Sequence, residues 1–334
     1  MLQPPVTIPI AFVHGLLSGA RTHGRDCDAL LADAGITPEL LGQVGARVTA
    51  DQYATLLRLL IERLDDEALG LLSRRLKRGS FELVARSAIG ATTVERAMRR
   101  VARTFRLLQD DVVLEPAREG SLAGLALCFL NPSVARQVFL HELLLRVLWR
   151  LLAWLAGGRL PAARFDFAFE TPPYAGSYGK IFPAPLQFER HASAFWFDAE
   201  RLQGAVRRDE AALRAFIADA QANVIVPRRF DVVSARVRSH LQQTLPTWPD
   251  LAATADALHI SNSTLQRRLA VEGTSYQTLK DELRRDMAIA RLNTSSAPLA
   301  ALAYELGFGD SAAFQRAFKQ WTGSAPGAYR RGGV

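Results

Sequence analysis

The chain has 334 residues, 49% of them hydrophobic and 22% charged, with a formal net charge of +8 and a pI near 10. This apolar content excludes a disordered chain and is enough to build the cores of two domains. The positive charge favours a polyanionic partner, although charge alone is weak evidence for one.

The cysteines and histidines show no arrangement typical of a metal site, a disulfide framework or a catalytic centre. Cys27 and Cys128 lie far apart, and no two of the six histidines have the spacing of a helical metal site. There is also no Gly-x-Ser-x-Gly elbow and no phosphate-binding loop. We therefore expect a protein without a metal or other cofactor that is not an enzyme.

Two apolar stretches lack the features of export or membrane signals. Residues 1–9 have no basic residue before their apolar positions and contain three prolines, unlike a secretory signal. Residues 139–156 are interrupted by His141, Glu142 and two arginines, which are too many polar groups for a bilayer span. The expected location is the cytoplasm, with no membrane partner.

The pattern from residue 14 to about residue 109 is helical. Apolar residues recur at spacings of three and four, for example at Tyr53, Leu56, Leu60 and Leu64, with arginines on the other face. This pattern predicts a packed bundle of helices. Strand-like segments follow at residues 112–116 and 122–130, and the intervening Arg118, Glu119 and Gly120 predict a hairpin turn.

A long apolar helix is expected after this hairpin, from about Pro132 to the glycine pair 157–158. Its charged residues recur every four positions as a narrow polar stripe: Glu142, Arg146 and Arg150. The other faces, rich in Leu and Trp, must then be buried. His141 and Glu142 are interpreted as a pair at the boundary of the core.

Further strand-like segments occur at residues 164–170 and 185–197, and a helix is expected at residues 209–222. Because these strands come in adjacent runs, an antiparallel or mixed sheet is favoured over a doubly wound one. Residues 226–229 contain Pro227 and are the best linker candidate. We therefore expect a regulatory, effector-binding domain at residues 1–225 and a second domain at residues 226–334.

An internal similarity predicts two helix-turn-helix units in the second domain. In each unit a small residue allows close helix approach, an apolar residue fills the corner, a Ser or Asp caps the next helix, and an apolar pair spaced by four buries one face of that helix. These residues are Ala255, Ile260, Ser261, Leu265 and Leu269 in the first unit, and Ala303, Phe308, Asp310, Phe314 and Phe318 in the second.

The two predicted turns differ at one position. The turn needs a residue at positive φ, which Gly307 supplies in the second unit and His259 must supply in the first. Between the units, residues 276–292 have a helical pattern and would span about 25 Å. Such a connector suits two recognition helices in successive major-groove faces, which lie about 34 Å apart.

The segment from about residue 250 to residue 331 resembles the DNA-binding domain of the AraC/XylS family. The resemblance is carried by STLQRRLAVEGTSY at 263–276 and LAYELGF at 302–308, with Phe314, RAF at 316–318, WTG at 321–323, Pro326, Tyr329 and Arg330. Residues from about 15 to 205 resemble the effector-binding domain of one subgroup, called arabinose-binding-like, a label that does not imply arabinose. The resemblance implies a sequence-specific DNA-binding transcriptional regulator.

The expected fold is thus an α+β N-terminal domain, with a helical bundle, an antiparallel or mixed sheet and a long helix, followed by an all-α domain with two helix-turn-helix units joined by a linker helix. Outward residues near the start of each recognition helix are expected to reach base edges. They are Ser263, Gln266 and Arg267 in the first unit, and Ser311, Ala312, Ala313 and Arg316 in the second.

These residue types predict unequal reading by the two units. Gln pairs with adenine and Arg with guanine, each through two hydrogen bonds, whereas alanine only contacts a thymine methyl group. The second unit is therefore expected to specify fewer bases, with Arg316 dominant. Three further basic residues lie off the reading face and are expected to contact phosphate or solvent: Arg268, Lys280 and Lys319.

A DNA reader joined to a large α+β domain suggests control by a small effector. The composition favours a hydrophobic or amphipathic effector, such as an acyl or aromatic acid whose charge meets an arginine. The candidate effector-binding residues are aromatic side chains with polar atoms: Trp149, Trp154, Tyr174, Tyr178 and Trp196.

Two alternatives remain at this stage. The N-terminal domain would serve only dimerisation or protein contact in a ligand-independent regulator. An enzyme fused to a DNA reader would need a reactive cysteine, and neither cysteine has an activating neighbour apart from the poorly placed Arg25. The expected partners are double-stranded promoter or operator DNA, a small-molecule effector, RNA polymerase and a second copy of the chain. Activation and repression remain equally open.

Overall fold

The computed structural model describes residues 7–158, 160–218, 233–272 and 274–330. The chain divides into two compact units. The mixed unit contains Ala11–Leu30 and Ala54–Pro227, and the helical unit contains Met1–Ile10, Leu31–Tyr53 and Arg228–Val334. The expected linker at 226–229 lies outside the described residues, and the division at residue 225 stays a prediction.

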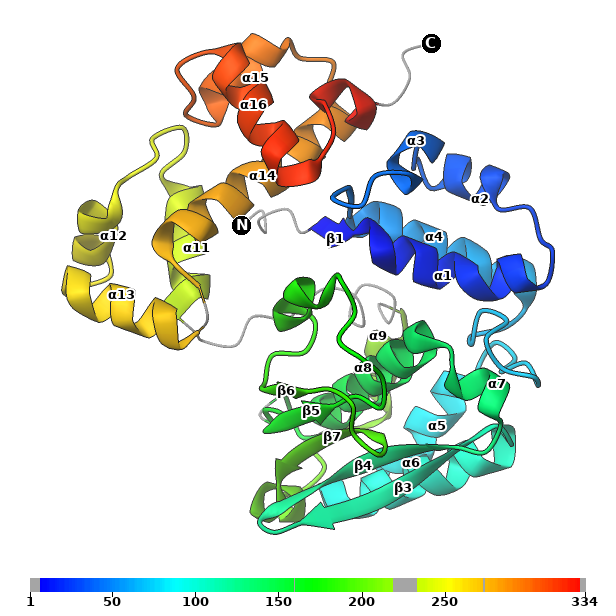
Figure 1. Cartoon of the computed structure of the whole chain (residues 1–334). Helices are drawn as coiled ribbons and strands as arrows, with labels where there is room; N and C mark the ends of the chain where they lie inside the picture. The colour runs from blue at the N-terminus through cyan, green and yellow to red at the C-terminus, as the bar shows by residue number, and fades with distance from the viewer. Residues whose placement is uncertain (1–6, 159, 219–232, 273, 331–334) are drawn as a thin grey trace. The chain divides into compact units, whose positions relative to one another are not determined.

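Helices dominate the described chain, with a five-stranded and a two-stranded sheet (Figure 1). The first elements are β1 (Thr7–Pro9), α1 (Ile10–Thr22), α2 (Asp28–Asp33), α3 (Pro38–Leu41), β2 (Arg47–Thr49), α4 (Ala50–Leu64), α5 (Ser80–Ile89), α6 (Val94–Leu108), β3 (Val112–Glu119), β4 (Leu122–Phe129), α7 (Pro132–Ala135) and α8 (Val138–Leu155). The chain continues with β5 (Arg164–Asp166), η1 (Ala175–Lys180), β6 (Leu186–Gln187), β7 (Ser193–Asp198), η2 (Ala199–Gln203), α9 (Glu210–Ala218), α11 (Val233–Gln243), α12 (Leu251–Ala257), α13 (Asn262–Val271), α14 (Tyr276–Thr294), α15 (Leu299–Glu305), α16 (Ser311–Thr322) and η3 (Pro326–Tyr329).

The mixed unit is built on a five-stranded sheet in the order β3-β4-β7-β5-β6. The β5–β6 pair is parallel and the other pairs are antiparallel, so the sheet is mixed, as expected. The β3–β4 pairing continues to Glu119 opposite Leu122. The expected three-residue turn is therefore wrong: Arg118 and Glu119 belong to the strand, and the loop is Gly120-Ser121, with Gly120 at φ 59°.

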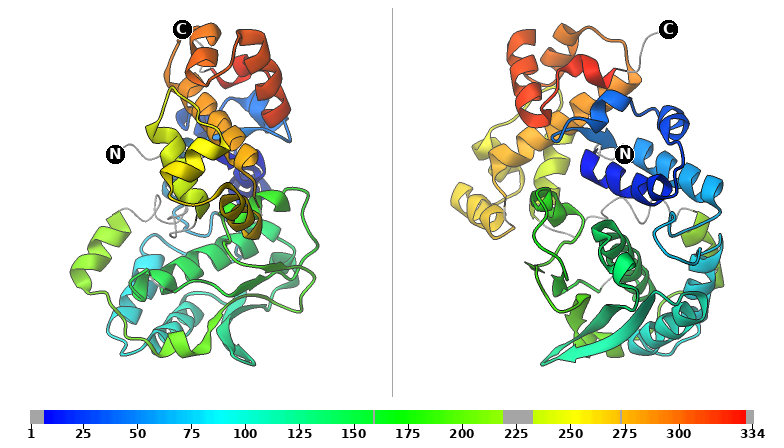
Figure 2. Two further views of the ribbon diagram at one scale, coloured as in Figure 1. Left: turned by 90° about the vertical axis from the view of Figure 1, so that its left-hand side faces the viewer. Right: turned by 45° about the vertical axis from the view of Figure 1, so that its right-hand side comes forward.

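Helices α5, α6 and α8 gather on one face of this sheet (Figure 2). Helix α6 is strongly amphipathic and begins at Thr93, whose side chain accepts a hydrogen bond from the backbone N–H of Arg96. Its buried residues recur at spacings of three and four: Val94, Ala97, Met98, Val101, Ala102 and Phe105. This face packs against β3 and α8, which forms the core over the sheet.

The structure corrects two expectations about the long apolar helix. The chain turns between Ala135 and Val138, so α7 and α8 are separate helices, and the His141 ring lies 2.9 Å from the carbonyl of Ala135. Glu142 and Arg146, expected in a polar stripe at the surface, are buried. Apolar residues surround them on α8, which makes the helix buried on nearly all sides.

In the helical unit, α14 is the central element. It packs against α11, β2 and η3, and buries an apolar stripe that includes Leu279, Leu283 and Leu292. Strands β1 and β2 form an antiparallel pair with Thr7 opposite Thr49. The segments Met1–Ile10 and Leu31–Tyr53 are therefore grouped with Arg228–Val334 in one compact unit.

Candidate nucleic-acid interface

Helices α12 and α13 form the first helix-turn-helix unit, and α15 and α16 form the second. Both turns have the same hydrogen bonds, which define a Schellman motif. In the first, the N–H of Ile260 donates to Ala255 O at 3.1 Å and that of His259 to Asp256 O at 3.0 Å. In the second unit, the N–H groups of the corresponding residues after α15 donate to Ala303 O and Tyr304 O, both at 2.9 Å. The sequence similarity thus reflects one shared backbone geometry.

The residue at the left-handed position of each turn is the one expected. His259 has φ 57° and Gly307 has φ 73°. A Cβ on Gly307 would lie 2.5 Å from Cδ1 of Trp248, so this position has no room for a side chain. The first turn therefore holds a residue in a strained conformation, and the second holds a glycine whose replacement would add both strain and a clash with Trp248.

Substitutions at these two turn positions are expected to change the free energy of unfolding in opposite directions. We expect Gly307→Ala to lower the free energy of unfolding by about 2 kcal/mol, because it adds strain at positive φ and a clash with Trp248. We expect His259→Gly to change it by about 1 kcal/mol or less in the stabilising direction. Urea unfolding of both variants checks the pair, and equal destabilisation by both would contradict this account of the turns.

Each recognition helix begins at a capping side chain. Ser261 accepts a hydrogen bond from the backbone N–H of Thr264 at 3.2 Å, and Asp310 accepts one from that of Ala313 at 2.7 Å. Beyond these caps, Leu265 and Leu269 of α13 and Phe314 and Phe318 of α16 are fully buried. The opposite face of each helix is consequently turned outward at its N-terminal end.

The predicted DNA-reading residues lie on these outward faces. Ser263, Gln266, Arg267, Ala312 and Arg316 are exposed. Among the described residues, the guanidinium groups of Arg267 and Arg316 have no hydrogen-bond or ion-pair partner, so their donors are available to a ligand. The remaining two predicted residues, Ser311 and Ala313, are half-buried.

One candidate was missed in the sequence. When the helices are aligned at their N-caps, Gln266 and Arg267 correspond to Gln315 and Arg316. Gln315 is exposed, and its side-chain amide donates to Ser311 Oγ at 3.2 Å. The extra residue Gly309 in the second turn shifts this register, and counting from the buried pair Phe314 and Phe318 would have revealed it.

A cation-π sandwich on α14 connects the two helix-turn-helix units. The Arg284 guanidinium lies 4.8 Å from the ring centroid of Trp248, just before the first unit, and 5.1 Å from that of Phe308, in the turn of the second. The indole N–H of Trp248 also donates to Glu305 O at 3.3 Å. Burial lowers the pKa of Arg284. These contacts connect the segment before the first unit and the turn of the second unit to one helix.

The three basic residues expected to contact phosphate or solvent do not behave alike. Lys280 donates to the carbonyl oxygens of Trp248 at 3.2 Å and Pro249 at 3.1 Å, and burial lowers its pKa. It therefore holds the segment before α12, contrary to expectation. Arg268 and Lys319 are exposed.

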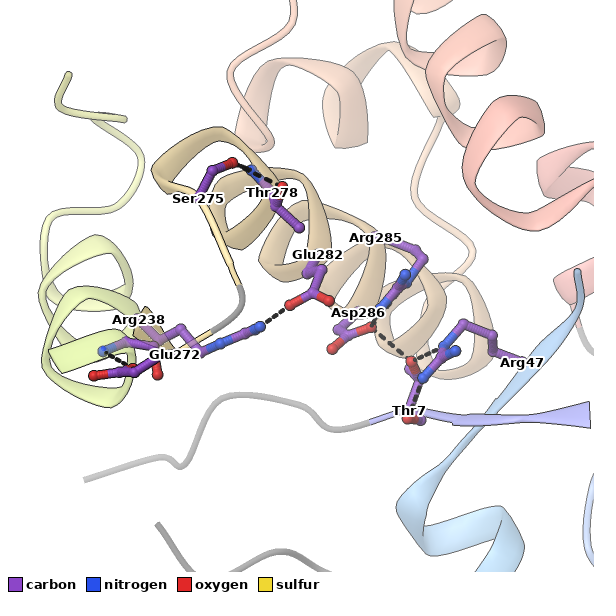
Figure 3. A network of polar contacts seen from close by, with 10 residues as sticks. Thr7, Arg47, Arg238, Glu272, Ser275, Thr278, Glu282, Arg285 and Asp286 are labelled. Carbon is purple, nitrogen blue, oxygen red and sulfur yellow. Dashed lines mark hydrogen bonds and ion pairs between the residues drawn. The ribbon is translucent and has the colours of Figure 1, made fainter. Parts of the chain in front are cut away.

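A polar network joins α14 to the β1–β2 pair within the helical unit (Figure 3). Thr7 Oγ1 donates to Asp286 at 2.6 Å and accepts from Arg47 Nε at 2.7 Å. Arg285 also donates to Asp286, at 3.0 Å. Burial lowers the pKa of Arg47 to about 10, so it remains charged at neutral pH. The network fixes the N-terminal segment to α14, the helix between the two helix-turn-helix units.

The same helix is tied to α11 at its other end. Arg238 of α11 forms an ion pair with Glu282 of α14 (Figure 3). Glu272, at the end of α13, accepts hydrogen bonds from the backbone N–H groups of Val233 and Ser234 at 2.8 and 3.0 Å. The recognition helix α13 is therefore connected to α11, and α11 to α14.

The five aromatic candidates for effector binding all have packing partners in the mixed unit. Trp149 packs edge-on against Phe165, and Trp154 stacks on Phe216 with centroids 4.4 Å apart. The other three make hydrogen bonds to carboxylates: Trp196 to Asp166 at 2.7 Å, Tyr174 to Glu142 at 2.9 Å, and Tyr178 to Glu142. Whether any of them contacts an effector stays a prediction.

Glu142 is a buried acid whose two oxygens differ. Oε1 accepts from Tyr174 and Tyr178, whereas Oε2 has no hydrogen-bond partner among the described residues. Burial raises the pKa of Glu142 to about 7. His141, next to it, lies 2.7 Å from Ser193 Oγ and is also buried, so the two residues belong to the core rather than its boundary.

Glu142 should make the stability of the chain depend on pH. Its pKa is about 7 in the folded state and near 4.5 when unfolded, so the folded state binds more protons in this range and stability falls as pH rises between these values. Glu142→Gln removes the titration. Its stability relative to the natural chain should rise by up to about 3 kcal/mol from pH 4.5 to pH 7. Urea unfolding at several pH values checks this, and a difference independent of pH would contradict it.

The described residues include no group of His, Cys, Asp and Glu side chains able to hold a metal ion. Both cysteines are free. Among the helices that the structure describes, none is both long and apolar enough to cross a bilayer.

Comparison with known sequences identifies both parts of the chain. A family described as the arabinose-binding domain of AraC transcription regulator, N-term, matches residues 24–206, more than half of the chain. A helix-turn-helix domain family matches residues 254–332. The matched segments thus include most of the mixed unit and both helix-turn-helix units.

Curated relatives are regulators as well. The chain is 28% identical to the ornithine utilization regulator of Pseudomonas aeruginosa, over 97% of this chain and 96% of the relative. It is 28% identical to the regulator VqsM of that organism, over 54% and 57% of the two chains, and 38% identical to VirS of Mycobacterium tuberculosis, over 30% and 31%. The solved structure of CdpR from Pseudomonas aeruginosa aligns over 99% of both chains at 19% identity, with a TM-score of 0.31.

Two helix-turn-helix units joined to a domain of the ligand-binding type define a DNA-binding transcriptional regulator, not an enzyme. The chain belongs to the AraC family of transcription regulators.

Proposed function

We propose that this regulator reads two successive major-groove faces of one operator with its two recognition helices. The observation that carries the proposal is the pair of capped helices whose exposed Arg267 and Arg316 occupy the same position after the cap. The proposed DNA contacts are Ser263, Gln266 and Arg267 of α13, and Ser311, Ala312, Ala313 and Arg316 of α16, with Gln315 added.

In this proposal, Arg267 and Arg316 each pair with a guanine and Gln266 with an adenine. Gln315, in the second unit, adds a residue able to read adenine. This narrows the difference expected between the units, although the second still presents two alanines where the first presents polar side chains.

We also propose that a small amphipathic effector, bound in the domain at residues 1–225, controls the reader at residues 226–334. The names of two relatives mention ornithine and raffinose, which share no common chemistry, so relatives do not indicate the effector. The proposal places the protein in the cytoplasm with the chromosome. It includes a homodimer and contact with RNA polymerase at the promoter.

Selection from a library of random DNA duplexes tests the reading proposal. The full chain should enrich a bipartite site whose two conserved parts are centred about 10 base pairs apart. Enrichment of one short element, or of no sequence at all, would contradict reading by both units.

A further inference from the structure

The mixed unit contains a cavity that none of the predicted effector residues lines. Its volume is about 730 Å³, and its walls come from α4, α5, α6, α8, α9 and the chain between α4 and α5. This volume lies within the range of about 300 to 1,000 Å³ that is typical of small-molecule sites. Such a cavity also disfavours the ligand-independent alternative, in which the domain would need only a dry core.

The apolar wall of the cavity explains why α8 is hydrophobic on nearly every side. Trp149 packs on Phe165 of the sheet, whereas Leu143 and Val147, one helical turn apart, line the cavity and are only half-buried. Phe105 of α6 and Leu57 of α4 contribute further apolar surface. A long apolar surface of this kind suits the chain or ring of an apolar ligand.

Charged side chains also line the cavity, and most are already engaged. Glu67 accepts hydrogen bonds from the backbone N–H groups of Gly79 at 2.8 Å and Phe81 at 2.7 Å. Two other lining charges form surface ion pairs: Glu82 with Arg86 at 2.6 Å, and Arg58 with Glu62 at 3.2 Å.

Arg78 differs from these groups. It is exposed, lines the cavity, and donates no hydrogen bond to any described residue, while the Glu67 carboxylate near it is occupied by backbone amides. A guanidinium with free donors pairs best with a carboxylate, through two parallel hydrogen bonds. Asp65 also lines the cavity, so an amine is the competing head group.

From this arrangement we propose that the cavity binds an amphipathic carboxylate, with its apolar part along Leu143 and Val147 and its carboxylate on Arg78. The inference rests on the proposed control of this regulator by a small effector, and it specifies the site and the chemistry of that molecule.

The position of the cavity connects it to the DNA reader through the chain. Ile217 and Ala218 of α9 line it, and residues 219–232 then lead along the chain to α11 of the helical unit. Helix α9 is held by Phe216, which stacks on Trp154 and lies 6.1 Å from Phe81. An occupant therefore contacts the last helix of the mixed unit that the structure describes.

Thermal unfolding of the full chain with decanoate, decylamine or decanol, each below its micelle-forming concentration, tests the site. Decanoate should raise the melting temperature in a concentration-dependent way and bind more tightly than the other two. Arg78→Gln should weaken decanoate binding about tenfold and leave decanol binding unchanged. Arg106→Gln, at an exposed arginine of α6 outside the cavity, should leave both unchanged.

A second variant tests the location independently. Val147→Trp should fill the cavity and abolish binding, whereas Leu107→Trp, at an exposed leucine on α6, should not. Should Val147→Trp fail to fold, Arg78→Gln still tests the site because Arg78 is at the surface. If decylamine bound as tightly as decanoate or more tightly, the assignment of a carboxylate head group would be wrong. If Arg78→Gln or folded Val147→Trp bound decanoate as the natural chain does, the assignment of the cavity as the binding site would be wrong.

Measuring DNA affinity with and without decanoate separates this inference from the proposed function. Decanoate binding that alters DNA affinity supports both. Decanoate binding without any change in DNA affinity keeps the site and contradicts effector control through it. Normal DNA binding by a chain that binds none of the three probes overturns the site and leaves DNA reading intact.

Discussion

Replacing Gln266 and Arg267 together by alanine is expected to weaken binding to the selected operator by about 2 to 6 kcal/mol, because each side chain is assigned one bidentate base contact worth about 1 to 3 kcal/mol. Both residues are exposed on a helix held in place by its buried face, so the fold should be unaffected. The measurement is fluorescence anisotropy at one fixed salt concentration, on operator and on scrambled DNA. Affinity for scrambled DNA should change far less.

The matched control lies on the same helix. Arg268 is exposed but is placed off the reading face. Arg268→Ala should therefore weaken binding to operator DNA and to scrambled DNA by similar factors, and the loss on the operator should be smaller than that of the double variant. If the double variant instead weakened both DNAs equally, Gln266 and Arg267 would be backbone contacts, and the assignment of base reading to them would be wrong.

Asp286→Ala is expected to lower the free energy of unfolding by about 3 to 5 kcal/mol, the usual cost of removing one partner of a buried ion pair. Asp286 is 4% exposed and receives hydrogen bonds from Thr7 and Arg285. Without it, the charges of Arg47 and Arg285 would face each other with no carboxylate between them. Urea unfolding measures the loss, and the N-terminal segment should become more accessible to protease.

Asp281 on the same helix provides the control. Its side chain is 34% exposed, and its carboxylate lies 3.9 Å from the guanidinium of Arg284, at the long end of ion-pair distances. Asp281→Ala should therefore cost about 1 kcal/mol or less. Losses of similar size in the two variants would show that the network around Asp286 has no special role in holding the N-terminal segment.

The DNA-binding part was predictable because its signals are local. A cap, a residue at positive φ and an apolar pair spaced by four lie within about 20 residues of each other, and both turns have the expected conformation. The register of the second recognition helix was less clear, because Gly309 lengthens the turn by one residue. That single residue is why Gln315 was missed.

Other features depend on contacts that a sequence pattern does not encode. The stripe containing Glu142 and Arg146 has the spacing of a solvated face. Inside the core, however, tyrosine hydroxyls donate to one oxygen of Glu142, and Arg146 donates to the carbonyl of Ile181. Likewise, Thr7 and Arg47 meet Asp286 across more than 200 residues of chain. Hydrophobic periodicity predicts that a helix is buried, and it does not identify the segment that covers it.

The most direct test of the central claim is to repeat the selection from random duplexes with Arg267→Ala and with Arg316→Ala, and to compare base preferences position by position. Each variant should lose the preference for one guanine, and the two affected positions should lie about 10 base pairs apart. Loss of affinity without any change in base preference, or loss of preference at the same position in both variants, would contradict reading of successive major-groove faces by the two units.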